Sequence, residues 1–359
     1  MIQYLTHDLL IHLIIFQLAV LTVIMSNIFI MHRSRKHAPP GSFPMVSILV
    51  PARNEEENII RCVQSLLVQD YPSFEVLVLD DQSSDGTLAM LNQMAVSYPE
   101  LKVFPGSLPP DGQLGKNWAC SQLACQAQGD LLFFTDADTV HQPHTLRTLV
   151  TALIGEQADL VTGFPQQQVR SCGEKLLVPF FGWASISFIP LWLAYRTKAQ
   201  ALVTAVGQVM LFRREAYQKI GGHDKLGKSI VDDLALAGKV KAAGMRWRVV
   251  RVSDLVSCRM YHGGREAVDG FTKNLFAAFN FHLLVYFFVF LWLAVLFLVP
   301  LAVLVSSPFG LAPTAQPWAL TACIGASLLL WIIPYAETGI PFYLGFLYPF
   351  TILANEVVA

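Results

Sequence analysis

Acidic residues gather at a few points of the chain, next to apolar runs. Asp80 and Asp81 follow one such run, and Asp136 and Asp138 follow another. The pair Asp232–Asp233 precedes a helical stretch. Two carboxylates at the end of a buried strand repel each other unless a divalent cation lies between them and a phosphate, and oxygen ligands favour Mg²⁺ or Mn²⁺. Asp136 and Asp138 therefore predict a metal site for phosphate chemistry. The alternative is a helix cap with a second, solvated acid.

Short apolar runs alternate with helical stretches between residues 45 and 275. The predicted strands cover residues 45–50, 74–79 and 130–135. This order predicts parallel βαβ units with a crevice at the carboxyl ends of the strands, where the acids stand. We expect an α/β fold with a Rossmann-like, mostly parallel sheet. No G-x-G-x-x-G or G-x-x-x-x-G-K-[ST] sequence follows a strand, which disfavours a dinucleotide or P-loop site.

The composition places part of the chain in lipid. Of 359 residues, 54% are hydrophobic and only 14% are charged, which is too apolar for ordinary soluble domains. The formal net charge is -1 and the polar region has no dense Lys/Arg cluster, so nucleic acid is not an expected partner. The six cysteines form no Cys-x-x-Cys pair, which argues against a zinc knuckle or a dense disulfide framework.

Apolar segments at both ends predict membrane helices. Residues 9–31 are long enough to cross a bilayer, and the basic residues 32–36 follow them, as in an anchor and unlike a cleaved leader. By the positive-inside rule, the polar region that follows is cytosolic. We expect an anchor with its basic flank over 1–44, a cytosolic domain over 45–275 and two or three membrane segments over 276–359. The predicted location is the cell (inner) membrane, with several passes.

The apolar stretch near 176–195 needs a separate interpretation. A single crossing there would separate the acids of 136–138 from those of 232–233 by the bilayer. We therefore expect a helix or helical pair lying in the membrane interface. A hairpin through the membrane is the alternative.

Several motifs in order resemble the family 2 glycosyltransferases with the GT-A fold, and the resemblance covers roughly residues 46–274. The motifs are Val46–Glu55, Asp80–Asp85, Gly115–Trp118, Asp136–Asp138 and Val231–Asp233. The resemblance implies a nucleotide-sugar donor, with UDP as the expected nucleotide. It assigns donor binding to Pro51, Arg53, Asn54, Glu55, Asp81, Lys116 and Asp136, the metal to Asp138 with Asp136, and the catalytic base to Asp233. Asp232 stands where that family usually has Glu.

Each part then has a chemical task. A metal and a lysine stabilise the charge that develops on the leaving diphosphate. Asp233 takes the proton of the attacking hydroxyl. A single base opposite the leaving group predicts inversion at the anomeric carbon. The alternative for Asp232–Asp233 is a helix N-cap with a first-turn acid, and both roles can hold together.

The acceptor is expected to be a membrane lipid. Gly207 and Gln208 resemble the family segment beneath the acceptor site, although an ordinary strand with a basic end fits the same residues. The segments 259–262 and 270–274 resemble membrane family 2 enzymes that glycosylate carotenoids or related isoprenoid lipids. We therefore expect transfer of a single sugar to the hydroxyl or carboxyl group of such a lipid. The residues assigned to the acceptor and diphosphate side are Gly207, Gln208, Asp232, Arg259, Tyr261 and Lys273.

Three alternatives stay open at this point. A processive polysaccharide synthase would share the acidic motifs, but Arg246–Trp247 lacks the Gln of the usual Gln-x-x-Arg-Trp signature. A catalytically silent membrane scaffold could keep the fold. A transporter would need charged residues within its membrane helices, and only Glu337 offers one. His141 and His144 form a His-x-x-His pattern, which we interpret as histidines at the start of a helix.

Overall fold

The computed structural model describes residues 2–279, 282–309 and 316–358. The chain divides into two compact units. We call residues 29–168 and 191–260 the sheet unit, and residues 1–28, 169–190 and 261–359 the helical unit. Each unit is described by itself.

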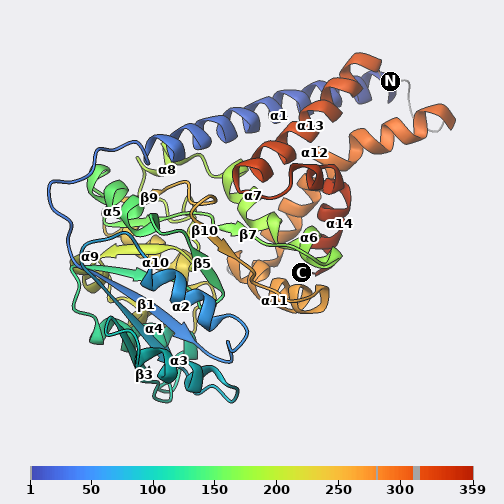
Figure 1. Cartoon of the computed structure of the whole chain (residues 1–359). Helices are drawn as coiled ribbons and strands as arrows, with labels where there is room; N and C mark the ends of the chain where they lie inside the picture. The colour runs from blue at the N-terminus through green and yellow to red at the C-terminus, as the bar shows by residue number, and fades with distance from the viewer. Residues whose placement is uncertain (1, 280–281, 310–315, 359) are drawn as a thin grey trace. The chain divides into compact units, whose positions relative to one another are not determined.

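A seven-stranded sheet organises the sheet unit, in the order β3-β2-β1-β4-β8-β6-β9 (Figure 1). The strand bounds are β1 Val46–Ala52, β2 Phe74–Asp80, β3 Leu101–Pro105, β4 Leu131–Phe134, β6 Leu160–Thr162, β8 Met210–Arg213 and β9 Trp247–Val249. Strand β8 is antiparallel to both of its neighbours, and the other pairs are parallel. The predicted α/β fold with a mostly parallel sheet is confirmed.

The central strands are buried on both faces, which explains their unbroken apolar runs. In β1, Ile48 and Leu49 point to opposite faces, and both are fully buried. The face of Ile48 packs with α2, α3 and α5. Helix α4 packs against β1 and β2. The helices of this unit are α2 Ile59–Leu67, α3 Thr87–Ala95, α4 Gly115–Gln126, α5 Thr145–Gly155, α8 Leu191–Ala194, α9 Arg214–Lys219, the 3₁₀ turn η1 His223–Leu226 and α10 Asp232–Ala242.

A small second sheet in the same unit has the order β5-β10-β7. Its strands are β5 Thr139–His141, β10 Val256–Cys258 and β7 Gln166–Gln167. His141 therefore lies in a strand, whereas His144 directly precedes α5. The interpretation of both histidines as helix-start residues is correct for His144 and wrong for His141. The hydrogen bonds of a strand partner, β10, hold residue 141 in the sheet.

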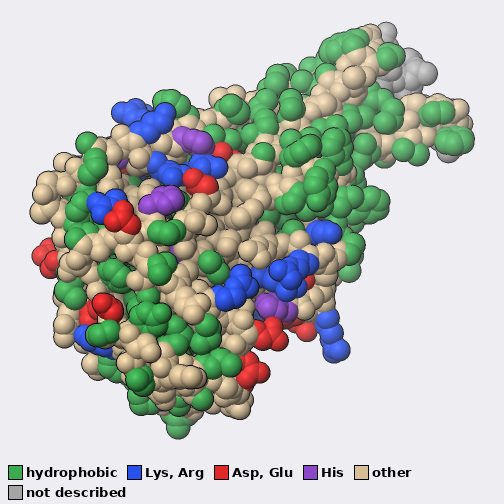
Figure 2. Space-filling model, viewed as in Figure 1, with side chains coloured by type: hydrophobic (Ala, Val, Ile, Leu, Met, Phe, Trp, Pro, Cys, Tyr) green, Lys and Arg blue, Asp and Glu red, His purple; other side chains and the backbone are tan. Residues whose placement is uncertain are grey.

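Among the described residues, three helices are long and apolar enough to cross a membrane, over Asp8–Arg33, Leu283–Phe309 and Pro317–Glu337. They belong to α1 (Ile2–Arg33), α12 (Leu283–Ser306) with the 3₁₀ turn η2 (Ser307–Phe309), and α13 (Pro317–Glu337). Figure 2 shows hydrophobic side chains over the long helices α12 and α13, as lipid-facing helices require. The remaining helices of the helical unit are α6 Cys172–Leu177, α7 Pro179–Phe188, α11 Gly264–Ala278, the 3₁₀ turn η3 Phe342–Leu347 and α14 Tyr348–Val358.

The apolar stretch near 176–195 folds into α6, α7 and α8, each far shorter than the roughly 20 residues of a spanning helix. Helix α7 packs on α13 within the helical unit. The Trp183 ring stacks on Trp331 with centroids 3.8 Å apart, and its Nε1 donates to the Leu330 carbonyl at 2.9 Å. Asn27 of α1 donates to the Ile186 and Ile189 carbonyls, both at 2.8 Å. The interfacial position of this stretch and the boundaries 1–44, 45–275 and 276–359 stay predictions.

Candidate functional site

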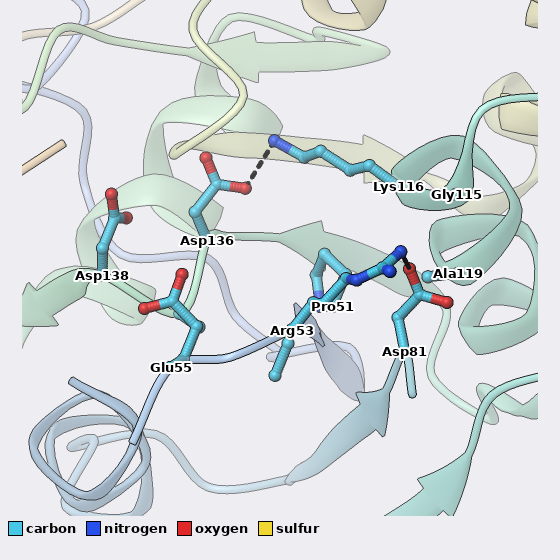
Figure 3. Close-up of a pocket in the computed structure, with 11 residues that line it drawn as sticks. Pro51, Arg53, Glu55, Asp81, Gly115, Lys116, Ala119, Asp136 and Asp138 are labelled. Carbon is cyan, nitrogen blue, oxygen red and sulfur yellow. Dashed lines mark ion pairs between the residues drawn. The ribbon is translucent and has the colours of Figure 1, made fainter. Parts of the chain in front are cut away.

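The predicted crevice is present in the sheet unit, at the carboxyl ends of β1, β2 and β4. It is a cavity of about 360 Å³. Its walls come from the ends of these three strands and from the first turns of α4 (Figure 3). The lining residues are Pro51, Ala52, Arg53, Glu55, Asp81, Gly115, Lys116, Ala119, Asp136, Ala137 and Asp138. Most of the residues predicted to bind the donor therefore share one space.

Asp81 lies at the end of β2, where it meets Arg53 from the end of β1. The Arg53 Nη1 lies 3.6 Å from the Asp81 Oδ2. The Asp81 backbone N–H donates to the Ala52 carbonyl at 2.7 Å and so joins the two strand ends. A Cβ at Gly115 would lie 3.0 Å from the Asp81 Oδ2, so the glycine lets the carboxylate approach the start of α4. The positive end of a helix dipole favours a carboxylate there.

Asn54 serves the loops beside the crevice and does not line it. Its backbone has a positive φ of 56°. Its N–H donates to the Ser83 Oγ at 2.9 Å, and its Oδ1 accepts from the Ser84 N–H at 2.8 Å. These bonds join the loops after β1 and β2. The role of Asn54 in donor binding stays a prediction.

Lys116 reaches from the first turn of α4 to Asp136, and its Nζ lies 2.7 Å from the Asp136 Oδ1 (Figure 3). Burial alone would lower the pKa of Lys116, but the charges of Asp136 and Asp232 outweigh it and hold this pKa well above its ordinary value. Lys116 therefore carries a full positive charge beside the acids, as stabilisation of a diphosphate requires.

Asp138 is the acid that best fits a metal. Its buried Oδ1 has no hydrogen-bond partner among the described residues. Burial, together with the charge of Asp136, raises the pKa of Asp138 to about 7. A cation would satisfy this oxygen and favour the ionised carboxylate. Within the described ranges, no three His, Cys, Asp or Glu side chains are grouped as metal ligands. A cation held by Asp136 and Asp138 would thus need further oxygens from a ligand such as a diphosphate.

Asp233 lies in the first turn of α10, the position that the alternative of a first-turn acid predicts, and its role as the base stays a prediction. Its Oδ1 accepts from the Leu234 N–H at 2.7 Å and its Oδ2 from the Gly207 N–H at 3.1 Å. Burial, together with the charge of Asp232, raises the pKa of Asp233 to about 7. A general base with a pKa near the working pH is well matched to its task.

The pKa of Asp232 is shifted in the opposite direction. Burial would raise its pKa, but Lys116 and the nearby His223 lower it to about 2. The His223 Nε2 lies 3.8 Å from the Asp232 Oδ2, and its Nδ1 lies 2.8 Å from the Tyr217 Oη. Asp232 is therefore the permanently ionised acid of the pair. Sequence reasoning missed His223, since no spacing signals a contact between residues nine positions apart in a loop.

Gly207 connects Asp233 to the crevice. Phe134 pairs with Met210 across the antiparallel strands β4 and β8, so the residues before β8 lie beside those after β4. A Cβ at Gly207 would lie 3.6 Å from the Lys116 Nζ and 3.9 Å from the Asp136 Oδ2. The same glycine donates to Asp233. The acid of α10 and the lysine–aspartate pair therefore face one space.

A hydrogen-bond network fixes the residues that follow β4 and those that precede β8. The Thr139 Oγ1 donates to the Asp136 carbonyl at 2.7 Å, and the Thr135 Oγ1 donates to the Gln208 carbonyl at 2.8 Å. His141 Nε2 lies within 3.1 Å of both hydroxyls. The Gln208 side chain is buried, and its Oε1 accepts from the Gln167 Nε2 at 2.9 Å. Gln208 thus forms part of the wall, and its acceptor contact stays a prediction.

The other residues assigned to the acceptor lie elsewhere in the chain. Arg259 follows β10 in the sheet unit. Tyr261 and Lys273 belong to the helical unit. The Tyr261 ring meets the Phe271 ring edge-on, and a Cβ at Gly270 would overlap the tyrosine. The roles of Arg259, Tyr261 and Lys273 in acceptor binding stay predictions.

Comparison with known proteins indicates the family and the fold. Residues 47–221 match the family model "Glycosyl transferase family 2". The fold is similar to that of a mannosyltransferase from Pyrobaculum calidifontis, solved in complex with GDP-Man and Mn²⁺. The TM-score is 0.55, with 21% identity over 97% of this chain and 98% of that one. Residues 47–221 are therefore similar to the family 2 glycosyltransferases and the fold is of the GT-A type, which confirms the resemblance that the motifs indicated.

Two curated relatives are named for lipid acceptors. A beta-monoglucosyldiacylglycerol synthase of Synechocystis sp. is 31% identical over 58% of this chain and 42% of its own length. A 4,4'-diaponeurosporenoate glycosyltransferase of Staphylococcus haemolyticus is 26% identical over 64% of this chain and 60% of its own length. The chain thus spans less than two thirds of either relative.

Proposed function

We propose that this protein transfers a single sugar from a nucleotide sugar to a membrane lipid, with inversion at the anomeric carbon. The observation that carries the proposal is the connection through Gly207. It joins the buried acid Asp233 to the Lys116–Asp136 pair at a crevice that also holds Asp81 and Asp138. Such a transfer needs a base linked to the donor crevice, and a cationic group and two carboxylates for a metal inside that crevice.

The donor occupies the crevice in this proposal. Asp81 and Arg53 at the ends of β2 and β1 supply the acceptor and donors for a nucleoside, and UDP is the nucleotide we expect. Lys116 lies against the diphosphate and stabilises its charge. Asp136 and Asp138 would hold Mn²⁺ or Mg²⁺, and a bound cation would neutralise developing charge on the leaving group. The unsatisfied Oδ1 of Asp138 supports this assignment.

Asp233 acts as the general base. As the acceptor oxygen bonds to the anomeric carbon, its proton passes to the Asp233 carboxylate. The bond between the anomeric carbon and the diphosphate oxygen breaks, and the nucleoside diphosphate leaves with the electron pair. One base and no carboxylate nucleophile give inversion. Asp232, held ionised by Lys116 and His223, keeps its neighbour basic.

The acceptor is a hydroxyl or carboxyl group of a membrane lipid, such as a carotenoid, another isoprenoid or a glycerolipid. Three helices suited to span a membrane support a membrane location, and relatives named for a carotenoid acid and a diacylglycerol support the acceptor class. We place the catalytic domain on the cytosolic face of the cell membrane, because the basic flank 32–36 follows the first span.

The test uses the full chain purified in lipid nanodiscs, with labelled UDP- and GDP-linked sugars, membrane lipid extract and Mn²⁺. We expect one labelled lipid product carrying one sugar, with the opposite anomeric configuration to the donor by NMR. Asp233→Asn should lose product by about 10³-fold and still bind the donor. Asp70→Asn is the matched control, since that side chain is 68% exposed on the same unit. A ladder of polymer lengths, or full activity in Asp233→Asn, contradicts the proposal.

A further inference from the structure

A second cavity lies in the sheet unit and shares no lining residue with the donor crevice. It has a volume of about 280 Å³. Its walls are the segment 194–198 after α8, the segment 244–248 that leads into β9, and Lys241 of α10. We call it the Trp247 pocket.

Positive charge dominates this pocket, and none of its lining residues is acidic. The cationic lining residues are Arg196, Lys198, Lys241, Arg246 and Arg248. Glu156 offsets one of them, since its Oε2 lies 3.2 Å from the Arg248 Nε. The Asp159 carboxylate accepts the backbone N–H of Arg246 at 2.7 Å, and the Arg246 guanidinium donates to the neutral Gln157 at 2.5 Å. The walls therefore keep a clear excess of positive charge.

Several side chains of the pocket are held in place by contacts with neighbouring groups. The Tyr195 ring meets the Trp247 ring edge-on at 5.3 Å, and the Arg248 guanidinium lies 4.3 Å from the Tyr195 ring centre. Lys241 is buried, and its Nζ donates to the Leu202 carbonyl at 2.6 Å. Burial lowers the pKa of Lys241, which a bound anion would offset.

The turn before β9 places one more cation at the pocket. Gly244 has a φ of 71°, which favours glycine, and a Cβ there would lie 3.8 Å from the Lys198 Nζ. The Lys198 ammonium therefore lies over this turn.

Two buried donors in the walls lack acceptors. Trp247 is 2% exposed, and its Nε1 has no hydrogen-bond partner among the described residues. The same holds for the buried Oγ1 of Thr197. An unsatisfied buried donor is destabilising, so binding of an acceptor that reaches it is favoured. An ordinary solvated basic surface has no such orphaned donors.

We propose that the Trp247 pocket binds a phosphate group, as a phosphomonoester or phosphodiester. Lysine and arginine donors converging from two segments suit a compact oxyanion with several acceptor oxygens. The side chain of Trp192 in α8, 47% exposed, immediately precedes the pocket segment, and exposed tryptophans are typical of the headgroup level of membranes. The phosphate can thus come from a phospholipid headgroup or from a soluble phosphate, and the experiment separates the two.

The soluble arm titrates glycerol 1-phosphate by calorimetry into the full chain in maltoside detergent micelles, which contain no phosphate, with EDTA present. The lipid arm titrates phosphatidylglycerol into the same micelles and follows the melting temperature of the protein to saturation. Each arm uses the wild type, Lys198→Gln and Lys219→Gln. Lys219 is an exposed lysine of α9 outside the pocket, so its variant loses the same charge elsewhere on the unit.

We expect saturable binding in at least one arm, weakened about tenfold in Lys198→Gln and unchanged in Lys219→Gln. Saturation by glycerol 1-phosphate identifies a soluble phosphate as sufficient. A rise in melting temperature with phosphatidylglycerol alone, reduced in Lys198→Gln, identifies the lipid headgroup. Equal weakening in both variants shows a diffuse charge effect and overturns the proposal, as does the absence of binding in both arms.

Discussion

The titration of Asp233 gives the sharpest test of the catalytic assignment. Its pKa is raised to about 7 by burial and by the charge of Asp232. A base works only when deprotonated, so activity should be present above pH 7 and fall as the pH drops through this value. With a pKa near 7, about nine tenths of the carboxylate is ionised at pH 8 and about one tenth at pH 6. We therefore expect kcat to fall roughly tenfold between pH 8 and pH 6.

A second variant shows which acid causes this fall. Asp232→Asn removes the negative charge that raises the pKa of Asp233, so the acid limb should move to lower pH. Asp138 also has a pKa of about 7, but the charges that raise it belong to Asp136 and Glu55, not to Asp232. A limb set by Asp138 would stay in place in Asp232→Asn.

The assay is single-turnover sugar transfer with saturating donor and Mn²⁺ from pH 5.5 to 8.5, so that product release does not mask the chemical step. Donor binding at each pH is measured in parallel. A kcat that stays flat between pH 6 and pH 8, or an acid limb that Asp232→Asn leaves in place or moves upward, refutes the assignment of Asp233 as base.

Three further predictions concern packing and charge. Gly207→Ala should lower kcat at least tenfold with little change in melting temperature. The added Cβ would lie 3.6 Å from the Lys116 Nζ, inside the site, and would cause no backbone strain. A normal kcat would contradict the placement of this loop. Lys116→Gln should lower kcat about 10²–10³-fold and leave the fold intact, since the Lys116 side chain is 46% exposed. Normal transfer in this variant would mean that the ion pair with Asp136 has no catalytic role. Trp183→Ala should destabilise the helical unit by about 3–5 kcal/mol in denaturant unfolding, because the Trp183 ring stacks on Trp331. Trp183→Phe keeps an aromatic ring and should lower the stability less. An equal loss in both variants would mean that stacking is not the cause.

The sequence by itself predicted the strands β1, β2 and β4 and the crevice at their ends. Short apolar runs that alternate with helical stretches indicate buried strands of a parallel sheet, and parallel strands present their carboxyl ends at one edge. Asp81, Asp136 and Asp138 were therefore expected together, and all three line one cavity. The long apolar helices also follow from composition alone, because a chain in lipid must satisfy its backbone internally.

Strand order was decided only by the tertiary structure. An ordinary strand was one interpretation of the segment after Gly207, but no sequence pattern indicates that β8 inserts antiparallel between β4 and β6. That insertion brings Gly207 beside the end of β4 and joins Asp233 to the crevice. The contacts of His223 with Asp232 and of Thr139 with Asp136 likewise depend on loops whose paths no local pattern specifies.

The Trp247 pocket likewise could not be predicted from the sequence. In the sequence, Arg196 and Lys198 are an ordinary basic loop, and Arg246–Trp247 is the start of a strand. Only the folded chain brings the two segments together and leaves the Trp247 N–H without an acceptor. Local sequence sets what each segment becomes, since backbone propensity and apolar spacing act over a few residues. The packing of the whole sheet decides which segments meet. The position of Asp233 beside the crevice and the Trp247 pocket both result from such meetings of distant segments.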